Sequence, residues 1–432
     1  MFITVQKAVL TNTKFKRLAL TILSVCLGVV SETKAVEAAS FNVVASGLDN
    51  PRRISFGTDG SLYVAESGKG GTGPVLVGPE LNVLLSFGLT GAVTRVQNGE
   101  QKRVVSNLPS LALFPAGSTV PQNFGSTLSS VGPHDIGFDK SGNAYAILGF
   151  ASTASQKATL GPNGADLGKL LSFNVNTDGS WTKNPNFSID LLAYKNLYNP
   201  YLQGTFFGDF LNNPYDLEVQ GDKFVIADAG GNNFFSADLS GNVTLESRFV
   251  GRNINNAFVE PVPTSITVGA DGAYYVSEFT GIPYPEKVAR IYRIAPGGKP
   301  EVYLDGFTQI TGLDFDDEGN LYVLEYSVNS ISDPTAKLAG QVIQVSPDGT
   351  RKTLIGADEG LVAPNGLTVG PDGALYISNL TNTIGTGQVV RFDPKARAVP
   401  EPPFSLAVLV VAVLTIIGQR NYHCKLQSKQ IG

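Results

Sequence analysis

The stretch GSLYVAES (residues 60–67) decides the fold, because its pattern occurs six times along the chain. Each copy has a turn-forming tip, an aromatic or apolar pair, and a short strand that ends in a small or acidic residue. The copies are FGTDGSLYVAES (56–67), FDKSGNAYAILG (138–149), VQGDKFVIAD (219–228), VGADGAYYVSEF (268–279), FDDEGNLYVLEY (315–326) and VGPDGALYISNL (369–380). Self-similarity at a spacing of tens of residues indicates one supersecondary unit that is stacked repeatedly.

The segments around each copy predict four-stranded antiparallel sheets. A short apolar strand precedes each tip, and Asx-Gly tips between such strands are typical of hairpins. A second hairpin follows most copies, as in GAVTRVQNGEQKRVVSNL (91–108). Two hairpins make one propeller blade, so the sequence predicts an all-β, six-bladed β-propeller over residues 40–398.

The two ends of the repeat region predict how the ring closes. The sixth repeat contains a third strand, GQVVRFDP (387–394), but no fourth. The segment SFNVVASGLDNP (40–51) copies the pattern of the fourth strand of the first repeat. We expect this N-terminal strand to complete the last blade, which removes edges that would otherwise invite aggregation.

The two termini predict export. Residues 1–39 carry basic side chains, an apolar run at 18–30 and small residues, the layout of a signal peptide. A retained membrane anchor is the alternative, although this run is short for a span. Residues 399–432 read VPEPP, an apolar run and a basic end, which predicts a transmembrane sorting tail or, alternatively, a plain tail anchor. We therefore expect a periplasmic, outer-envelope or cell-surface protein that is membrane-tethered before any tail processing.

Charge and cysteine content exclude two classes of function. The net charge is −5 although both termini are basic, so the central body is acidic and is a poor partner for nucleic acid. Both cysteines, Cys26 and Cys424, lie in the terminal segments. The body therefore has neither a disulfide framework nor thiol chemistry.

Polar residues at the ends of the second strands form a candidate metal site, since these ends should meet at one side of the ring. They are Glu66, Asp228, Glu278, Glu325 and Asn379, with Leu148 as the exception. Crowded carboxylates favour a shared cation, and oxygen ligands without cysteine favour Ca²⁺ or Mg²⁺. The alternative is that these acids cap backbone N–H groups or pair with Arg52 and Arg53.

The residues that open the first strands should surround the same side of the ring. The candidate ligand-binding residues are Arg52, Arg53, Tyr215, Asp216, Thr264 and Asn365. His134 is the one histidine of the body, and with Asp135 beside it we consider it a candidate general base. A hydrogen bond that braces the rim is the alternative. The aromatic-rich insertion at residues 191–210 either stacks on a flat ligand or forms a hydrophobic lid.

Several of these strings resemble known families. GSLYVAESG, GNLYVLEYS and GALYISNL look like NHL repeats. GLDNPRRISFGTDGSLYVAESGKGGTGP, TGAVTRV, NLPSLA and VGPHDIGFD are similar to the ScyD/ScyE family of exported cyanobacterial proteins, over residues 40–394. The tail resembles the PEP-CTERM sorting signal. The resemblance implies a role in assembly of the pigment scytonemin and a sorting protease that cuts the tail.

These observations predict that the protein binds or processes a small aromatic or polar ligand at the channel mouth. One alternative is a non-catalytic surface module or scaffold for polysaccharide or protein. Another is a metal-dependent lactonase or hydrolase, as in similar six-bladed propellers. Enzymatic activity stays open at the level of sequence, because no Ser-His-Asp or paired-histidine arrangement can be found around the one histidine.

Overall fold

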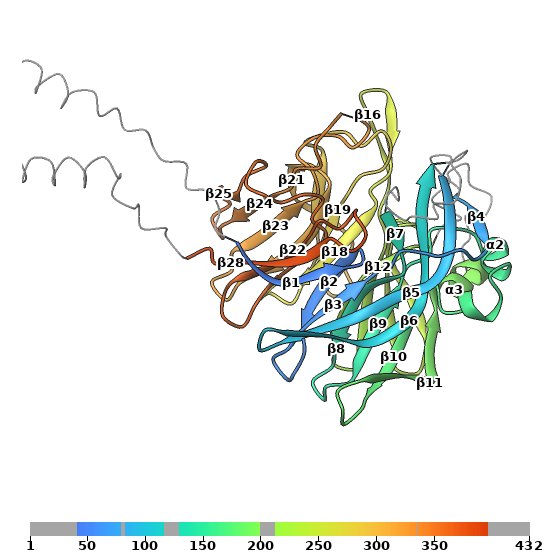
Figure 1. Cartoon of the computed structure of the whole chain (residues 1–432). Coiled ribbons are helices and arrows are strands. Elements are labelled where there is room, and N and C mark those ends of the chain that lie inside the picture. The colour runs from blue at the N-terminus through green and yellow to red at the C-terminus, as the bar shows by residue number, and fades with distance from the viewer. Residues whose placement is uncertain (1–40, 79–82, 116–128, 199–211, 334, 396–432) are drawn as a thin grey trace, which may run out of the picture. The chain divides into compact units, whose positions relative to one another are not determined.

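The computed structural model describes residues 41–78, 83–115, 129–198, 212–333 and 335–395, and this part of the chain is almost entirely antiparallel β-sheet (Figure 1). The predicted signal peptide (1–39) and sorting tail (399–432) lie outside the described residues. No described helix has both the length and the apolar character needed to cross a membrane.

The first two repeats form two sheets. One contains β2 (Pro51–Phe56), β3 (Leu62–Glu66), β5 (Val83–Gln97), β6 (Glu100–Pro115) and β7 (Ser129–Val131), with β4 (Val75–Val77) paired to β5. The other contains β8 (Pro133–Phe138), β9 (Ala144–Leu148), β10 (Lys169–Val175) and β11 (Trp181–Asp190). Short helices α2 (Ala154–Ala158) and η1 (Gly161–Gly164) precede β10, and α3 (Leu191–Tyr198) follows β11.

The next three repeats form three four-stranded sheets. Their strands are β12 (Pro214–Gln220), β13 (Lys223–Asp228), β14 (Asn233–Asp238) and β15 (Val243–Arg248); β18 (Pro263–Val268), β19 (Tyr274–Glu278), β20 (Ala289–Ile294) and β21 (Glu301–Phe307); and β22 (Ile310–Phe315), β23 (Leu321–Glu325), β24 (Gln341–Val345) and β25 (Arg351–Ile355). A separate hairpin, β16 (Arg252–Ile254) with β17 (Ala257–Val259), stands between the first and second of these sheets.

The last sheet joins the two ends of the described chain. It contains β26 (Leu367–Val369), β27 (Leu375–Asn379), β28 (Gly387–Phe392) and β1 (Asn42–Leu48). Strand β1 runs antiparallel to β28, with Val43 opposite Val390. The predicted pairing of the first strand with the last is therefore confirmed.

The first strand of each repeat faces the centre of the assembly. We call β2, β8, β12, β18, β22 and β26 the inner strands. Neighbouring inner strands contact each other in chain order, and β26 in turn contacts β2. Residues of all six line a central cavity of about 160 Å³. This is the arrangement of a β-propeller, in which repeated sheets surround a central channel.

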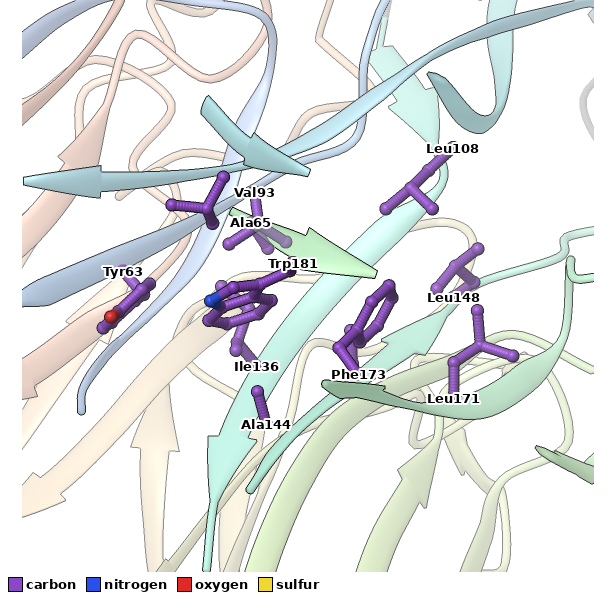
Figure 2. Packing of buried hydrophobic residues seen from close by; sticks show 12 residues of the cluster. Tyr63, Ala65, Val93, Leu108, Ile136, Ala144, Leu148, Leu171, Phe173 and Trp181 are labelled. Carbon is purple, nitrogen blue, oxygen red and sulfur yellow. The ribbon is translucent and has the colours of Figure 1, made fainter. Parts of the chain in front are cut away.

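Aliphatic residues, with Tyr63, Phe173 and Trp181 among them, fill the space between neighbouring sheets (Figure 2). The ring of Trp181 from β11 stacks on Tyr63 from β3 at 5.1 Å and meets Phe138 from β8 edge-on at 5.7 Å. Each strand alternates its side chains between two faces, and both faces of the inner sheet regions are covered by neighbouring sheets. This explains why the second strands read as continuous apolar runs.

The β5–β6 hairpin is longer at its open end than the hairpin that the sequence indicated at residues 91–108. Residues 83–88 and 109–115 extend the β5–β6 hairpin, with Leu85 opposite Leu113 and Phe87 opposite Leu111. Leu85 and Leu111 are buried against Leu76 of β4. The apolar alternation in these segments was the signal that could have predicted the longer strands.

A substitution at Gly366 would test the close packing of the last sheet against the first. A Cβ at this position would lie 2.6 Å from the carbonyl oxygen of Arg52 and 2.9 Å from the Cα of Arg53. We expect Gly366→Ala to lower the free energy of unfolding by about 1–3 kcal/mol, the usual cost of overpacking. Chemical denaturation would measure this loss. Gly356→Ala is the control, because its nearest neighbour is a flexible Glu359 oxygen at 3.7 Å. Equal stability of the two variants would contradict the close approach.

Candidate functional site

Equivalent residues occupy two successive positions near the start of each inner strand, or directly before it in the case of β26. The outer position, nearer the strand start, holds Arg52, His134, Tyr215, Thr264, Thr311 and Asn365. The deeper position holds Arg53, Asp135, Asp216, Ser265, Gly312 and Gly366. The register is the same in five sheets, since the first residue of the inner strand pairs with the last residue of the second strand: Pro51 with Glu66, Pro133 with Leu148, Pro214 with Asp228, Pro263 with Glu278 and Ile310 with Glu325.

Side chains at the deeper position connect neighbouring inner strands. Asp135 accepts the Leu217 N–H at 2.8 Å, Asp216 accepts the Ile266 N–H at 2.7 Å, and Ser265 accepts the Leu313 N–H at 3.0 Å. An inner strand is an edge strand, so its outward N–H groups have no sheet partner. Each oxygen therefore satisfies a buried backbone donor of the next sheet. We call these contacts the inter-sheet braces.

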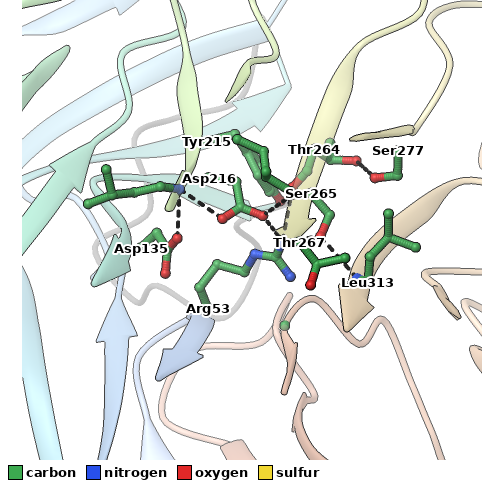
Figure 3. A network of polar contacts seen from close by, with 12 residues as sticks. Arg53, Asp135, Tyr215, Asp216, Thr264, Ser265, Thr267, Ser277 and Leu313 are labelled. Carbon is green, nitrogen blue, oxygen red and sulfur yellow. Dashed lines mark hydrogen bonds and ion pairs between the residues drawn. The ribbon is translucent and has the colours of Figure 1, made fainter. Parts of the chain in front are cut away.

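Arg53 belongs to the same set of braces. Its Nη2 pairs with the Asp216 carboxylate and also donates to the Ser265 hydroxyl (Figure 3). Arg53 and Asp216 are both buried. Burial lowers the pKa of Arg53, and neighbouring acids, Asp135 first among them, oppose this shift. Arg53 and Asp216, which were predicted to bind a ligand, thus form an ion pair with each other.

The outer position supplies a second set of braces that run from side chain to carbonyl. His134 Nδ1 lies 3.1 Å from the Pro214 carbonyl oxygen. Thr264 Oγ1 donates to the Ile310 carbonyl at 2.6 Å, and Thr311 Oγ1 donates to the Pro364 carbonyl at 3.1 Å. Thr264 is therefore bound to the neighbouring strand. The contact of His134 Nδ1 is thus a hydrogen bond that braces the rim, which was the alternative interpretation of this residue.

The predicted pairing of His134 with Asp135 is not found. Asp135 accepts the Ile136 and Leu217 N–H groups and lies at the deeper position, while His134 is held by Pro214. Since a carbonyl only accepts, His134 Nδ1 carries the proton and Nε2 carries a lone pair. Burial, followed by the charge of Arg52, lowers the His134 pKa to about 3. The imidazole is neutral at physiological pH, but it is a weak base for proton abstraction.

The five predicted metal ligands are each engaged within or beside their own sheet. Glu66 accepts the Asp49 N–H at 2.7 Å and pairs with Arg103 at 2.7 Å. Glu278 receives both terminal nitrogens of Arg252, each at 2.7 Å. Arg252 comes from hairpin β16–β17, which the sequence analysis did not anticipate.

The remaining three cap backbone groups ahead of the next inner strand. Asp228 accepts the Asn213 N–H, Glu325 the Thr308 N–H and Asn379 the Val362 N–H, each at 2.7 Å. Among the residues that the structure describes, no cluster of three or more His, Cys, Asp or Glu side chains is placed to hold a metal. In this arrangement the five residues do not form a Ca²⁺ or Mg²⁺ site. Their hydrogen bonds show that they cap backbone N–H groups.

Two residues at the outer position also have polar atoms that make no hydrogen bond with the described residues. Asn365 Nδ2 donates to the Tyr215 hydroxyl at 2.7 Å, and the Tyr215 ring lies 4.7 Å from the His134 ring. Within the described part of the chain, His134 Nε2 and Asn365 Oδ1 are buried and have no hydrogen-bond partner. We call Arg52, His134, Tyr215, Tyr326 and Asn365 the His134 cluster.

Local structure keeps the His134 cluster in place. A Cβ on Gly149 would lie 2.2 Å from His134 Cε1, so only glycine leaves space for the imidazole. Tyr326 follows the last residue of β23 and is near Arg52 and Tyr215, whose charges act on its pKa. Burial raises the pKa of Tyr326 to about 12, so its hydroxyl stays protonated. Tyr215 and Tyr326 remain partly exposed, which leaves a route to solvent.

The central cavity contains acids that sequence reasoning missed. Glu218 and Asp314 lie two residues beyond the deeper position on β12 and β22, on the same strand face. Burial raises the pKa of Glu218 to about 8, and Asp314 and Asp135 raise it further. Burial also raises the pKa of Asp135 to about 7. The period-two alternation of each inner strand was the signal that could have identified them.

Comparisons with known proteins support no more than a general likeness. No family model matches the sequence, and no curated protein matches it significantly. Solved structures of similar arrangement include a virginiamycin B lyase from Staphylococcus aureus, with 12% identity over 83% of this chain and 90% of that chain and a TM-score of 0.41. Another is a protein of unknown function from Bacteroides thetaiotaomicron, with 12% identity, 82% and 72% coverage and a TM-score of 0.46. Such values transfer no substrate and no catalytic residue.

The Arg53–Asp216 pair predicts a large loss of stability when one partner is removed. Asp216→Ala leaves a buried guanidinium without its counter-charge and the Ile266 N–H without its acceptor. We expect a loss of about 3–5 kcal/mol in the free energy of unfolding, measured by denaturant titration. Glu318→Ala removes an exposed pair with Lys395 and should leave the free energy of unfolding nearly unchanged. Similar losses in both variants would refute the role of the brace.

The cavity acids predict that stability falls as the pH rises. The pKa values of Glu218 and Asp135 are raised in the folded state, so the folded chain holds protons that the unfolded chain releases. The free energy of unfolding should therefore decrease between about pH 4.5 and pH 8. Glu218→Gln should reduce this slope in denaturation at several pH values. Glu246→Gln should preserve the slope, because the Glu246 pKa is lowered by its bond to Ser236. A profile that is unchanged by Glu218→Gln would contradict the assignment.

Proposed function

We propose that this chain is an exported six-bladed β-propeller that binds a small aromatic ligand at the His134 cluster. The six repeats, the six sheets and the pairing of β1 with β28 support the six-bladed architecture. The terminal segments of the sequence support export and a membrane-tethered stage before the tail is cut. The resemblance to the ScyD/ScyE family supports a place in scytonemin-type pigment assembly.

One observation carries the binding proposal: two buried acceptor atoms, His134 Nε2 and Asn365 Oδ1, lack partners among the described residues. A buried polar atom without a hydrogen bond costs about 1–3 kcal/mol, so such atoms need an explanation. A ligand that donates hydrogen bonds would satisfy both. The adjoining Tyr215 ring offers an apolar face on which a flat ligand can stack.

Binding without chemistry is the better-supported form of this proposal. A general base works best with a pKa near the operating pH, and the pKa of His134 is lowered to about 3. Asp135, the proposed orienting carboxylate, is engaged in a brace with Leu217. The hydrolase alternative therefore lacks both a matched base and its orienting partner. A scaffold for polysaccharide or protein has no specific contact in its favour.

Titration calorimetry with a panel of indolic and phenolic compounds tests the proposal. We expect at least one compound to bind, and Asn365→Leu or Tyr215→Leu to weaken its affinity about tenfold, because each removes a group that faces the ligand. Tyr303→Leu on the outer strand β21 is the matched control and should bind normally. Binding that is unaffected by both cluster variants would overturn the proposed location. Product formation that is lost in His134→Gln would favour the hydrolase alternative.

A further inference from the structure

Arg52 is a buried cation without an acidic partner. Its side chain is 6% exposed, like that of Arg53, which is 5% exposed. Arg52 donates to the Ser67 hydroxyl at 3.2 Å, to the Ser129 hydroxyl at 2.6 Å and to the Ser130 carbonyl. All three acceptors are neutral. Within the described residues, no carboxylate lies within ion-pair distance of Arg52, whereas Arg53 pairs with Asp216.

The neighbouring ionisable groups do not balance the charge of Arg52. The His134 imidazole is neutral, and the raised pKa of Tyr326 keeps its hydroxyl protonated. A buried charge without a counter-charge costs several kcal/mol, and structures usually keep one only where something compensates it. The sequence could have placed a neutral residue here, as it does with Thr264 and Thr311 at the equivalent position. The guanidinium therefore calls for an anion from outside the chain.

The hydrogen-bond capacity of Arg52 leaves room for that anion. Nε and Nη2 are used by the three serine acceptors, whereas Nη1 makes no hydrogen bond with the described residues. An anion on Nη1 would receive charge-assisted hydrogen bonds, which are stronger than neutral ones. The same ligand would lie near the unpartnered acceptors of His134 and Asn365. Cation and acceptors together specify a molecule with a negative group and a separate N–H or O–H donor.

We propose that the ligand of the His134 cluster is a small aromatic carboxylate whose ring carries a hydrogen-bond donor, with its carboxylate on Arg52. A single guanidinium balances one negative charge, so a singly charged anion fits better than a more highly charged one such as phosphate. The Tyr215 ring suits a planar molecule. This inference rests on the proposed function and adds the charge and chemical class of its ligand.

A matched ligand pair separates this inference from the proposed function. The probes are indole-3-carboxylate and indole-3-carboxamide, which have nearly the same shape and differ in charge. We expect the full-length protein to bind the carboxylate about tenfold or more tightly than the amide in titration calorimetry. Arg52→Met should abolish this preference by weakening carboxylate binding much more than amide binding, and Arg52→Lys should restore part of it.

Stability measurements distinguish a binding arginine from a structural one. Arg52→Met removes an uncompensated charge, so its melting temperature without ligand should stay near or above that of the wild type. Arg53→Met is the matched control at the adjacent position, and it should melt at a clearly lower temperature because Asp216 loses its partner. If Arg52→Met melts as low as Arg53→Met, the arginine is a structural brace and the inference is overturned.

Each binding outcome decides between the two proposals. Equal affinity for both probes, unchanged by Arg52→Met, would overturn the carboxylate inference while the aromatic site stands. If neither probe binds, benzoate and inorganic phosphate are titrated next. Binding of benzoate that depends on Arg52 supports the inference, and tighter binding of phosphate overturns it. Failure of all four probes, together with an unresponsive indolic and phenolic panel, would overturn both proposals.

Discussion

The structure depends on hydrogen bonds from a backbone N–H of one inner strand to a side-chain oxygen of the preceding inner strand. Asp135, Asp216 and Ser265 provide these acceptors in three consecutive sheets. An inner strand has a neighbour in its own sheet on one side only, so its other edge would leave buried donors unpaired. Hydrophobic packing holds neighbouring sheets together, but it sets no register between them. The braces supply that register.

The inter-sheet braces differ where glycine occupies the deeper position. Gly312 on β22 and Gly366, which directly precedes β26, occupy the deeper position, and the neighbouring strand or sheet approaches too closely there for a side chain. Asp314, two residues further along β22, accepts the Val369 N–H of β26 at 2.7 Å and so continues the pattern one step deeper. Arg53 reaches across to Asp216 instead of to the next strand. The braces thus differ from one inner strand to the next. As a result, Arg52 and His134 keep hydrogen-bonding groups that no neighbouring strand uses.

Sequence reasoning predicted the repeats, the strands and the pairing of β1 with β28, because these follow from local periodicity and turn chemistry. It placed Arg52, His134, Tyr215 and Asn365 at one side of the assembly, because strand register carries over from repeat to repeat. It could not assign partners. Arg53 and Asp216 are 163 positions apart, and nothing local distinguishes an arginine that is paired at that distance from its unpaired neighbour. The pairing of Glu278 with Arg252 could not be predicted for the same reason, since Arg252 belongs to a hairpin that the sequence did not indicate.

The sheet that unites β1 with β26, β27 and β28 has a consequence for the timing of folding. Residues 42–48 leave the ribosome early, and their partner at 387–392 emerges about 340 residues later. At synthesis rates of roughly 5–20 residues per second, the leading strand waits tens of seconds for its place. Throughout that interval Ala45 and Leu48, which are buried in the finished protein, lack the part of their cover that Val389 of β28 provides. A chain of this design benefits from a chaperone or an export route that holds it unfolded until its last strand is available.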